Sequence, residues 1–258
     1  MRVDLAPVAL AGTWLTLEPL QEHHAIDLFA AMQDEEVCRY LAWPPPARIE
    51  DTQALVRDAR EATARGQTVA FAQVWNETGR AIGSTRLLDI RPADRHVEIG
   101  STFLARAYWR TPANTESKYL LLTHAFERLG CVRVALKTDG RNVRSQEAIA
   151  RLGAVREGVL RKHMNVRGYQ RDTVYYSIVE TEWPAVKARL EARLFGAGCQ
   201  HVTAGHPPGR AEGRSKPHSA QGGRRLRSLR GHRRGYARRC AQRSRRLHAE
   251  AGADDLGR

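Results

Sequence analysis

The sequence lacks any long apolar run. No stretch of about 18 or more apolar residues occurs, the length that a helix needs to cross a bilayer. The N-terminus also lacks a positively charged segment followed by an apolar run, which is the pattern of a secretory signal. We therefore expect no membrane partner and a cytoplasmic location.

Disulfide and metal-binding patterns are absent as well. The four cysteines, at positions 38, 131, 199 and 240, form no C-x-x-C pair. No H-E-x-x-H motif occurs, and the adjacent His23 and His24 lack the spacing of a metal-binding pair. We expect neither a disulfide framework nor a metal site.

Acidic residues are scarce at the C-terminal end. Residues 196–258 hold 15 Lys and Arg against 4 Asp and Glu, whereas residues 1–195 hold 27 against 24. The net charge of +14 therefore comes mainly from the C-terminal segment, which has almost no aliphatic clusters. Such a segment cannot bury enough apolar surface to offset the entropy lost on ordering. We expect a folded domain over residues 1–195 and a disordered basic tail over residues 196–258.

Apolar residues within the first 195 positions recur with two periods. A period of two predicts strands, and a spacing of three to four predicts helices. The predicted strands are Thr13–Leu17, Thr68–Trp75, Ala81–Ile90, His96–Leu104, Cys131–Lys137, Ala154–His163 and Thr173–Val179. The predicted helices are Ala25–Met32, Glu50–Arg65, Asn114–Leu129, Asn142–Leu152 and the segment from Pro184. This order predicts a mixed α/β fold.

The strand at 96–104 carries the first candidate functional residue. Alternation places Val97, Ile99 and Phe103 on one face of the strand, and Glu98, Gly100 and Thr102 on the other. The strand–helix–strand unit at 97–137 requires a parallel or splayed pair of strands with a right-handed crossover. Its helix therefore begins beside the ends of both strands.

Three stretches resemble the GNAT N-acetyltransferases, in particular the branch related to ribosomal-protein N-terminal acetyltransferases. They are Glu98–Gly100, Tyr108–Glu116, and Asn142–Ser145 leading to Arg151–Ala154. The resemblance covers the whole domain and implies a GNAT fold, in which a mixed central sheet with flanking helices splays between its fourth and fifth strands. It also implies that acetyl-CoA, the co-substrate, lies in that opening.

The resemblance implies that the pyrophosphate of acetyl-CoA sits at the start of the helix predicted from Asn114. The free N–H groups and the positive dipole end of a helix start favour a phosphate, and Arg110 adds a positive charge. The two glycine positions of the family signature are Ala113 and Thr115 here, a departure from the pattern. Asn142 matches a cofactor-contacting asparagine. The alternative is that Asn114, Thr115 and Asn142 only cap helices.

Glu98 is the candidate general base, because amine acetylation requires removal of a proton from the attacking nitrogen. The alternative is that Glu98 faces solvent or pairs with an arginine. The family's frequent thiolate-protonating tyrosine is replaced by Ile149. The resemblance implies that Ser145 takes the thiolate side of the reaction instead, although its place in the first turn of a helix is equally that of a cap.

The resulting interpretation is an enzyme, an acetyl-CoA-dependent acyltransferase that acetylates a primary amine by direct attack. The acceptor could be a protein N-terminus or a small-molecule amine, and the enzyme a monomer or a homodimer. The alternative function is nucleic-acid binding through the arginine-rich tail alone, since such segments bind phosphate backbones. A third interpretation of the tail is an out-of-frame reading of a GC-rich gene.

Overall fold

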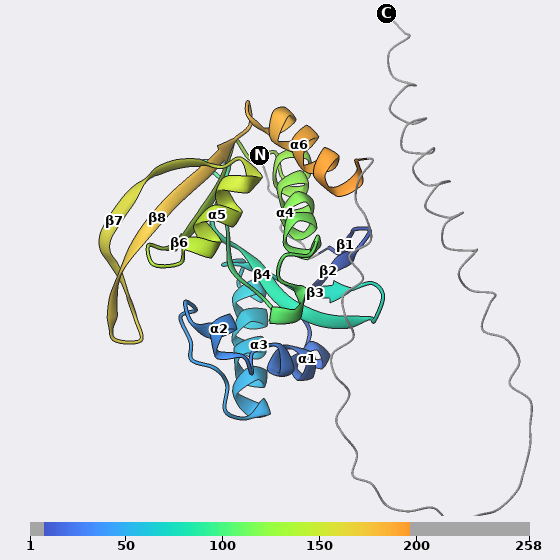
Figure 1. The fold of residues 1–258 in the computed structure, drawn as a ribbon, viewed down its shortest axis with the longest axis vertical. Helices are drawn as coiled ribbons and strands as arrows, with labels where there is room; N and C mark the ends of the chain where they lie inside the picture. Colours follow the sequence, from blue (N-terminus) through green and yellow to red (C-terminus); the bar gives the residue numbers. More distant parts are fainter. Residues whose placement is uncertain (1–7, 197–258) are drawn as a thin grey trace, which may run out of the picture. The chain divides into compact units, whose positions relative to one another are not determined.

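The computed structural model describes residues 8–196, which belong to one compact unit of the chain. They form one eight-stranded sheet in the order β1-β2-β3-β4-β5-β6-β8-β7, with helices on both faces (Figure 1). The strands are Leu10–Ala11 (β1), Leu15–Pro19 (β2), Val69–Trp75 (β3), Arg80–Arg91 (β4), His96–Leu104 (β5), Arg133–Asp139 (β6), Val155–Val166 (β7) and Tyr169–Val179 (β8). The helices are Ala25–Ala31 (α1), Glu35–Cys38 (α2), Ile49–Ala64 (α3), Ala113–Thr123 (α4), Val143–Leu152 (α5) and Trp183–Phe195 (α6).

This architecture confirms the predicted mixed α/β fold, and its differences from the prediction are local. The strand β1 and the helix α2 were not predicted. The helix α2 forms directly at the acidic run because the side chain of Asp34 accepts the N–H of Glu36 and caps it. The helix predicted to reach Leu129 is α4 followed by a wider, π-helical turn at His124–Arg128.

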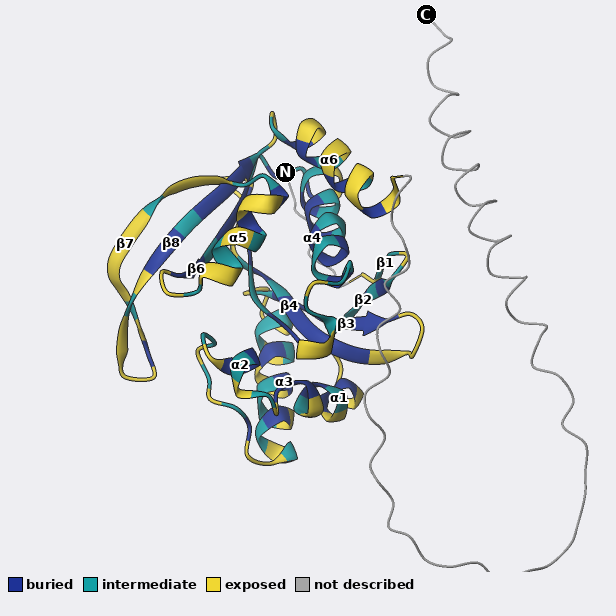
Figure 2. Ribbon diagram, in the orientation of Figure 1, coloured by how far each residue is buried: buried dark blue, intermediate teal, exposed yellow. Residues whose placement is uncertain are grey.

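Two apolar cores lie on opposite faces of the sheet (Figure 2). Alternate residues of β3 divide between them: Phe71 belongs to the core under α4, α5 and α6, whereas Ala72 belongs to the core under α1, α2 and α3. This period-two division is what a strand covered on both faces requires. The sheet therefore has an α4–α6 face and an α1–α3 face.

A β-bulge in β5 changes the alternation that the sequence predicted. Ser84 pairs with Phe103 and Arg86 pairs with Gly100, so β5 has one residue more than β4 in this interval. The extra residue is Ser101, whose backbone is left-handed with φ of 47°. After the bulge the faces are exchanged.

The predicted placement of Phe103 with Val97 and Ile99 is consequently wrong. Phe103 packs in the core under α1, α2 and α3, whereas Val97 and Ile99 pack in the core under α4. Thr102, predicted to share a face with Glu98, instead meets Lys118 of α4.

The predicted basic tail at residues 196–258 lies outside the described residues, except for Gly196. Within residues 8–196, no helix is long and apolar enough to cross a membrane.

Candidate active site

The sheet opens between β5 and β6. These strands run parallel and pair only at His96–Glu98 with Arg133–Ala135. Beyond these pairs β5 follows β4 to Leu104, and β6 follows β8 to Asp139. The expected splay between the two strands is therefore present, and it begins at Glu98.

The segment that follows β5 turns into the start of α4 at this opening. Thr111 organises the turn, because its hydroxyl donates to the carbonyl of Tyr108 and accepts the N–H of Ala113. Asn114 and Thr115 lie in the first turn of α4, where no intrahelical carbonyl can accept their N–H groups. Arg110 is exposed beside this helix start. All four predicted phosphate-binding residues of this segment thus lie together.

The left-handed backbone of this segment falls at Arg110, which the sequence analysis identified by its charge but not by its conformation. Its φ is 63°, whereas neither Ala113 nor Thr115, the positions matched to glycine, has a positive φ. Nothing in the identity of an arginine signals a left-handed conformation, which glycine adopts most readily. The strained residue therefore had no sequence signature.

Glu98 is buried, with 2% of its surface exposed, on the α1–α3 face of β5. Its Oε2 lies 2.9 Å from the Nζ of Lys137, on the neighbouring strand β6. Gly100 provides the space for this carboxylate, because a Cβ at that position would lie 2.8 Å from the Oε1 of Glu98. The two non-catalytic alternatives predicted for Glu98 are thus wrong. Its side chain does not face solvent, and its ion-pair partner is a lysine instead of an arginine.

The ion pair also acts on Lys137. Burial alone would lower the pKa of this lysine, but the hydrogen bond and the charge of Glu98 outweigh burial and raise it. Lys137 therefore stays protonated and holds the carboxylate in place. The sequence analysis did not identify Lys137, although the period-two alternation along β6 would have placed it on the same face of the sheet as Glu98.

Asn142 and Ser145 meet at the start of α5. The Oδ1 of Asn142 accepts the backbone N–H of Ser145 at 3.1 Å, which caps the helix. Within residues 8–196, the hydroxyl of Ser145 makes no hydrogen bond. Helix capping was the alternative role for both residues. Asn142 supplies the cap, and the side chain of Ser145 takes no part in it. Ile149 is buried in the core.

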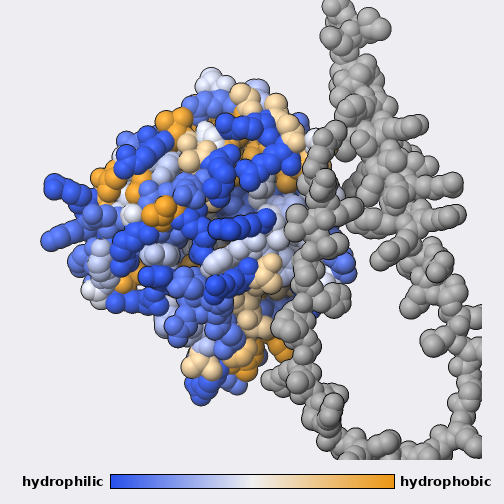
Figure 3. Space-filling model, in the orientation of Figure 1, coloured by the Kyte–Doolittle hydropathy of each residue, from blue (hydrophilic) through white to orange (hydrophobic). Residues whose placement is uncertain are grey.

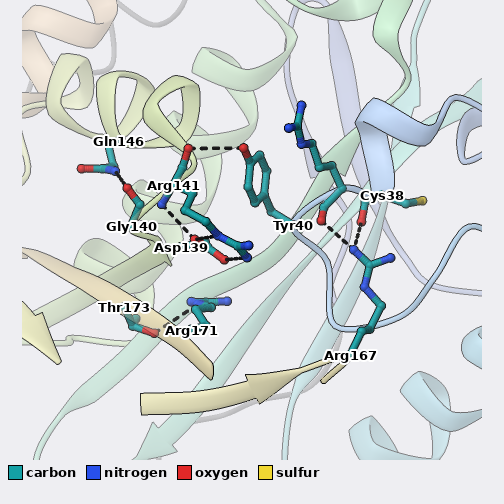
Figure 4. A network of polar contacts seen from close by, with 10 residues as sticks. Cys38, Tyr40, Asp139, Gly140, Arg141, Gln146, Arg167, Arg171 and Thr173 are labelled. Atoms are coloured by element: carbon teal, nitrogen blue, oxygen red, sulfur yellow. Dashed lines mark hydrogen bonds and ion pairs between the residues drawn. The ribbon is translucent and has the colours of Figure 1, made fainter. Parts of the chain in front are cut away.

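On the α1–α3 side, the β7–β8 hairpin reaches the segment after α2 (Figure 4). The Arg167 guanidinium donates to the carbonyl oxygens of Cys38 and Arg39. Across the same space, the hydroxyl of Tyr40 donates to the carbonyl of Arg141, in the turn after β6. These contacts connect the end of α2 and the residues after it to the turn after β6 and to the hairpin.

Two buried charged residues of α4 also escaped sequence reasoning. Glu116 accepts the backbone N–H groups of Thr13, Trp14 and Leu15, and so fastens the start of β2 to α4. Lys118 donates to the hydroxyl of Thr102, in the bulge of β5. Both contacts are remote in sequence, and the polar residues of an amphipathic helix are ordinarily expected to face solvent.

Glu18, His23 and His24 form the one described cluster with metal-ligand atoms close together. However, the Nδ1 of His24 accepts the N–H of Gln21, and its Nε2 lies 3.3 Å from Glu18. This arrangement places the ring proton on Nε2, the nitrogen that would have to bind the metal. The hydrogen bonds thus account for the cluster without an ion.

Comparisons with known proteins agree with this geometry. The family model of the acetyltransferase (GNAT) domain matches residues 15–155, more than half of the chain. "Uncharacterized N-acetyltransferase p20" of Bacillus licheniformis is 24% identical over 169 residues, which cover 66% of this chain and 94% of that protein. "Putative ribosomal N-acetyltransferase YdaF" of Bacillus subtilis (strain 168) is 32% identical over 109 residues, 42% of this chain and 59% of that protein.

Solved structures show the same similarity. A GCN5-related N-acetyltransferase from Brucella melitensis superposes with a TM-score of 0.70 at 32% identity, over 73% of this chain and 86% of that chain. Enzymes of this family generally take the acetyl group from acetyl-CoA. The chain therefore belongs to the GNAT family of N-acetyltransferases.

Proposed function

We propose that the chain transfers the acetyl group of acetyl-CoA to a primary amine by direct attack, without a covalent enzyme intermediate. The observation that carries this proposal is the position of Glu98. It is the last residue of β5 paired with β6, so its buried carboxylate lies where the two strands separate. The start of α4 lies at the same opening.

The start of α4 fits the pyrophosphate of acetyl-CoA. Asn114 and Thr115 offer first-turn N–H groups without intrahelical acceptors, and the helix dipole adds a partial positive charge. Arg110 supplies a full positive charge and is exposed. Across the opening, at the start of α5, we assign Asn142 as a second contact to the cofactor.

Glu98 takes the proton of the amine, directly or through a water, as the nitrogen attacks the thioester carbonyl. A C–N bond forms and the C–S bond breaks, and the departing thiolate receives a proton from the hydroxyl of Ser145 or from solvent. Lys137 is a positioning residue that holds the carboxylate in place. Positioning of the amine against the thioester and polarisation of its carbonyl by backbone N–H groups supply the rest of the rate.

Calorimetric titration of the full chain with acetyl-CoA tests the donor side. We expect a dissociation constant on the order of micromolar. Arg110→Ala should weaken binding by about 1–2 kcal/mol, because a charge-assisted hydrogen bond to phosphate is lost. Arg65→Ala, an exposed arginine at the end of α3, is the matched control and should bind normally.

Acetyl transfer is then measured as thiol release with a panel of primary amines. Absence of heat and of any thermal shift with excess acetyl-CoA would reject the proposed donor. Equal affinity of Arg110→Ala and wild type would reject the assigned phosphate contact alone.

A further inference from the structure

Arg171 is a half-buried cation on the same face of the sheet as Glu98. Val174 and Tyr176 of β8 pack in the core under α4 and α5, so the alternate residues Arg171, Thr173 and Tyr175 project to the opposite face. Tyr175 pairs with Lys137 of β6, which holds Glu98. Arg171 and the proposed base, Glu98, therefore lie on the same face of the sheet.

Three other cations around this space have anionic or carbonyl partners. Lys137 pairs with Glu98. Arg141 pairs with Asp139 at 2.7 Å, and Arg167 donates to the carbonyls of Cys38 and Arg39 (Figure 4). Arg171 differs from them. Its Nε donates to the hydroxyl of Thr173 at 3.1 Å, but within residues 8–196 no carboxylate oxygen lies within 4 Å of its guanidinium.

Partial burial of a guanidinium that has no paired anion costs free energy. Burial lowers the pKa of Arg171, and the charges of Asp139 and Glu98 only partly compensate. The planar fork of an arginine is suited to a carboxylate, which it binds through two parallel hydrogen bonds. The guanidinium of Arg171 can therefore bind an additional anion on the face of the sheet that carries Glu98.

The surroundings of Arg171 combine polar and apolar side chains. The β7–β8 hairpin shows hydrophilic areas and separate apolar patches on the face seen in Figure 3, and Val159, Leu160 and Tyr169 are exposed. The ring of His163 on β7 lies 3.2 Å from the hydroxyl of Thr173 that Arg171 also contacts.

We infer that Arg171 binds a carboxylate of the acceptor, so the preferred substrates are primary amines that also carry a carboxylate near the amino group. Such a carboxylate belongs either to a free amino acid or to an acidic residue that follows a peptide N-terminus. This inference rests on the proposed function, since it assigns the acceptor of the same site.

Two matched pairs of acceptors test it with the full chain. Alanine against alaninamide probes the carboxylate of a free amino acid, and Ser-Glu-Ala-amide against Ser-Gln-Ala-amide probes an acidic side chain. We expect wild type to prefer the carboxylate member of at least one pair by about tenfold or more in kcat/KM, as loss of a charge-assisted hydrogen bond predicts. The pair that shows the preference identifies the source of the carboxylate.

Three variants extend the test. Arg171→Gln should bring the preference to about one, Arg171→Lys should keep part of it, and Arg161→Gln, an exposed arginine of β7, should keep all of it. Thermal midpoints establish that each variant is folded, and the comparison within wild type needs no variant at all. Turnover without preference in wild type, or a preference that survives in Arg171→Gln, would overturn this inference alone. No turnover of any amine would overturn the proposed function together with it.

Discussion

Lys118 is an ionisable residue that the fold buries, and no carboxylate of residues 8–196 pairs with it. Only 5% of its surface is exposed, and its Nζ donates to the hydroxyls of Thr102 at 2.7 Å and Thr85 at 3.4 Å. Burial lowers the pKa of Lys118 from 10.5 to about 7. The stability of the protein should therefore depend on pH through this one side chain.

The sign and the size of that dependence follow from linkage. Above about pH 7 the folded protein has released the proton of Lys118, whereas the unfolded chain keeps it up to its ordinary pKa of 10.5. The unfolded state then binds more protons, so stability rises with pH between about 7 and 10.5 and is lowest below that window. At about 1.4 kcal/mol per pKa unit, the full shift corresponds to about 5 kcal/mol.

The perturbation that isolates this effect is Lys118→Met, which keeps a straight side chain and removes the charge. Thr85 and Thr102 remain hydrogen-bonded to each other, their hydroxyls being 2.8 Å apart. We expect the variant to be more stable than wild type at pH 6, and its advantage to shrink by about 1.4 kcal/mol for each pH unit above 7.

Urea unfolding of both proteins from pH 6 to pH 9 measures this difference. Titrations elsewhere in the chain are shared by the two proteins and cancel. Lys162→Met, at an exposed lysine of β7, should show no such trend. Parallel stability curves for wild type and Lys118→Met would refute the reasoning, because they would show that folding leaves the affinity of Lys118 for its proton unchanged.

The remaining predictions concern the reaction and the start of α5. Glu98→Gln should lower kcat by about 10²-fold or more and leave the calorimetric affinity for acetyl-CoA unchanged, because a general base contributes ~10²–10⁴; an unchanged kcat would reject the base. Asn142→Ala should lower the free energy of unfolding by about 1 kcal/mol in urea titrations, because it removes the cap. Ser145→Ala should leave the free energy of unfolding unchanged and lower kcat. An unchanged kcat in this variant would mean that solvent, and not Ser145, protonates the thiolate.

Local apolar patterns predicted most of the elements, although a strand covered on both faces, such as β3, shows a nearly continuous apolar run instead of an alternation. On β3, alternate residues enter two different cores, and the helices show one apolar stripe each. Helix ends were equally legible: Asn142 caps α5, and Gly153 ends it with φ of 100°. These signals are local, so a single sequence contains them.

The parts of the site that depend on distant contacts could not be predicted in the same way. The partner of Glu98 comes from β6, and the partners of Glu116 lie about a hundred positions earlier, at 13–15. Gly100, directly before Ser101, is the one local sign of the bulge, and the predicted alternation ran through it and placed Phe103 on the wrong face. For Glu98 and Glu116, by contrast, the partners are set by tertiary contacts that the local sequence does not indicate.

The β-bulge in β5 contributes to the separation of β5 from β6. A bulge increases the local twist and bends its strand, and Ser101 lies only three residues after Glu98, the last residue of β5 that pairs with β6. The strand therefore turns away from β6 immediately after presenting the carboxylate. Lys118 contacts Thr102 from the α4–α6 face, so the helix whose start faces the proposed phosphate site also supports the strand that bends. Substitutions at Lys118 or Thr102, beneath the bulge, should accordingly change both the affinity for acetyl-CoA and kcat, although neither residue is assigned a contact with the cofactor or with the reacting atoms.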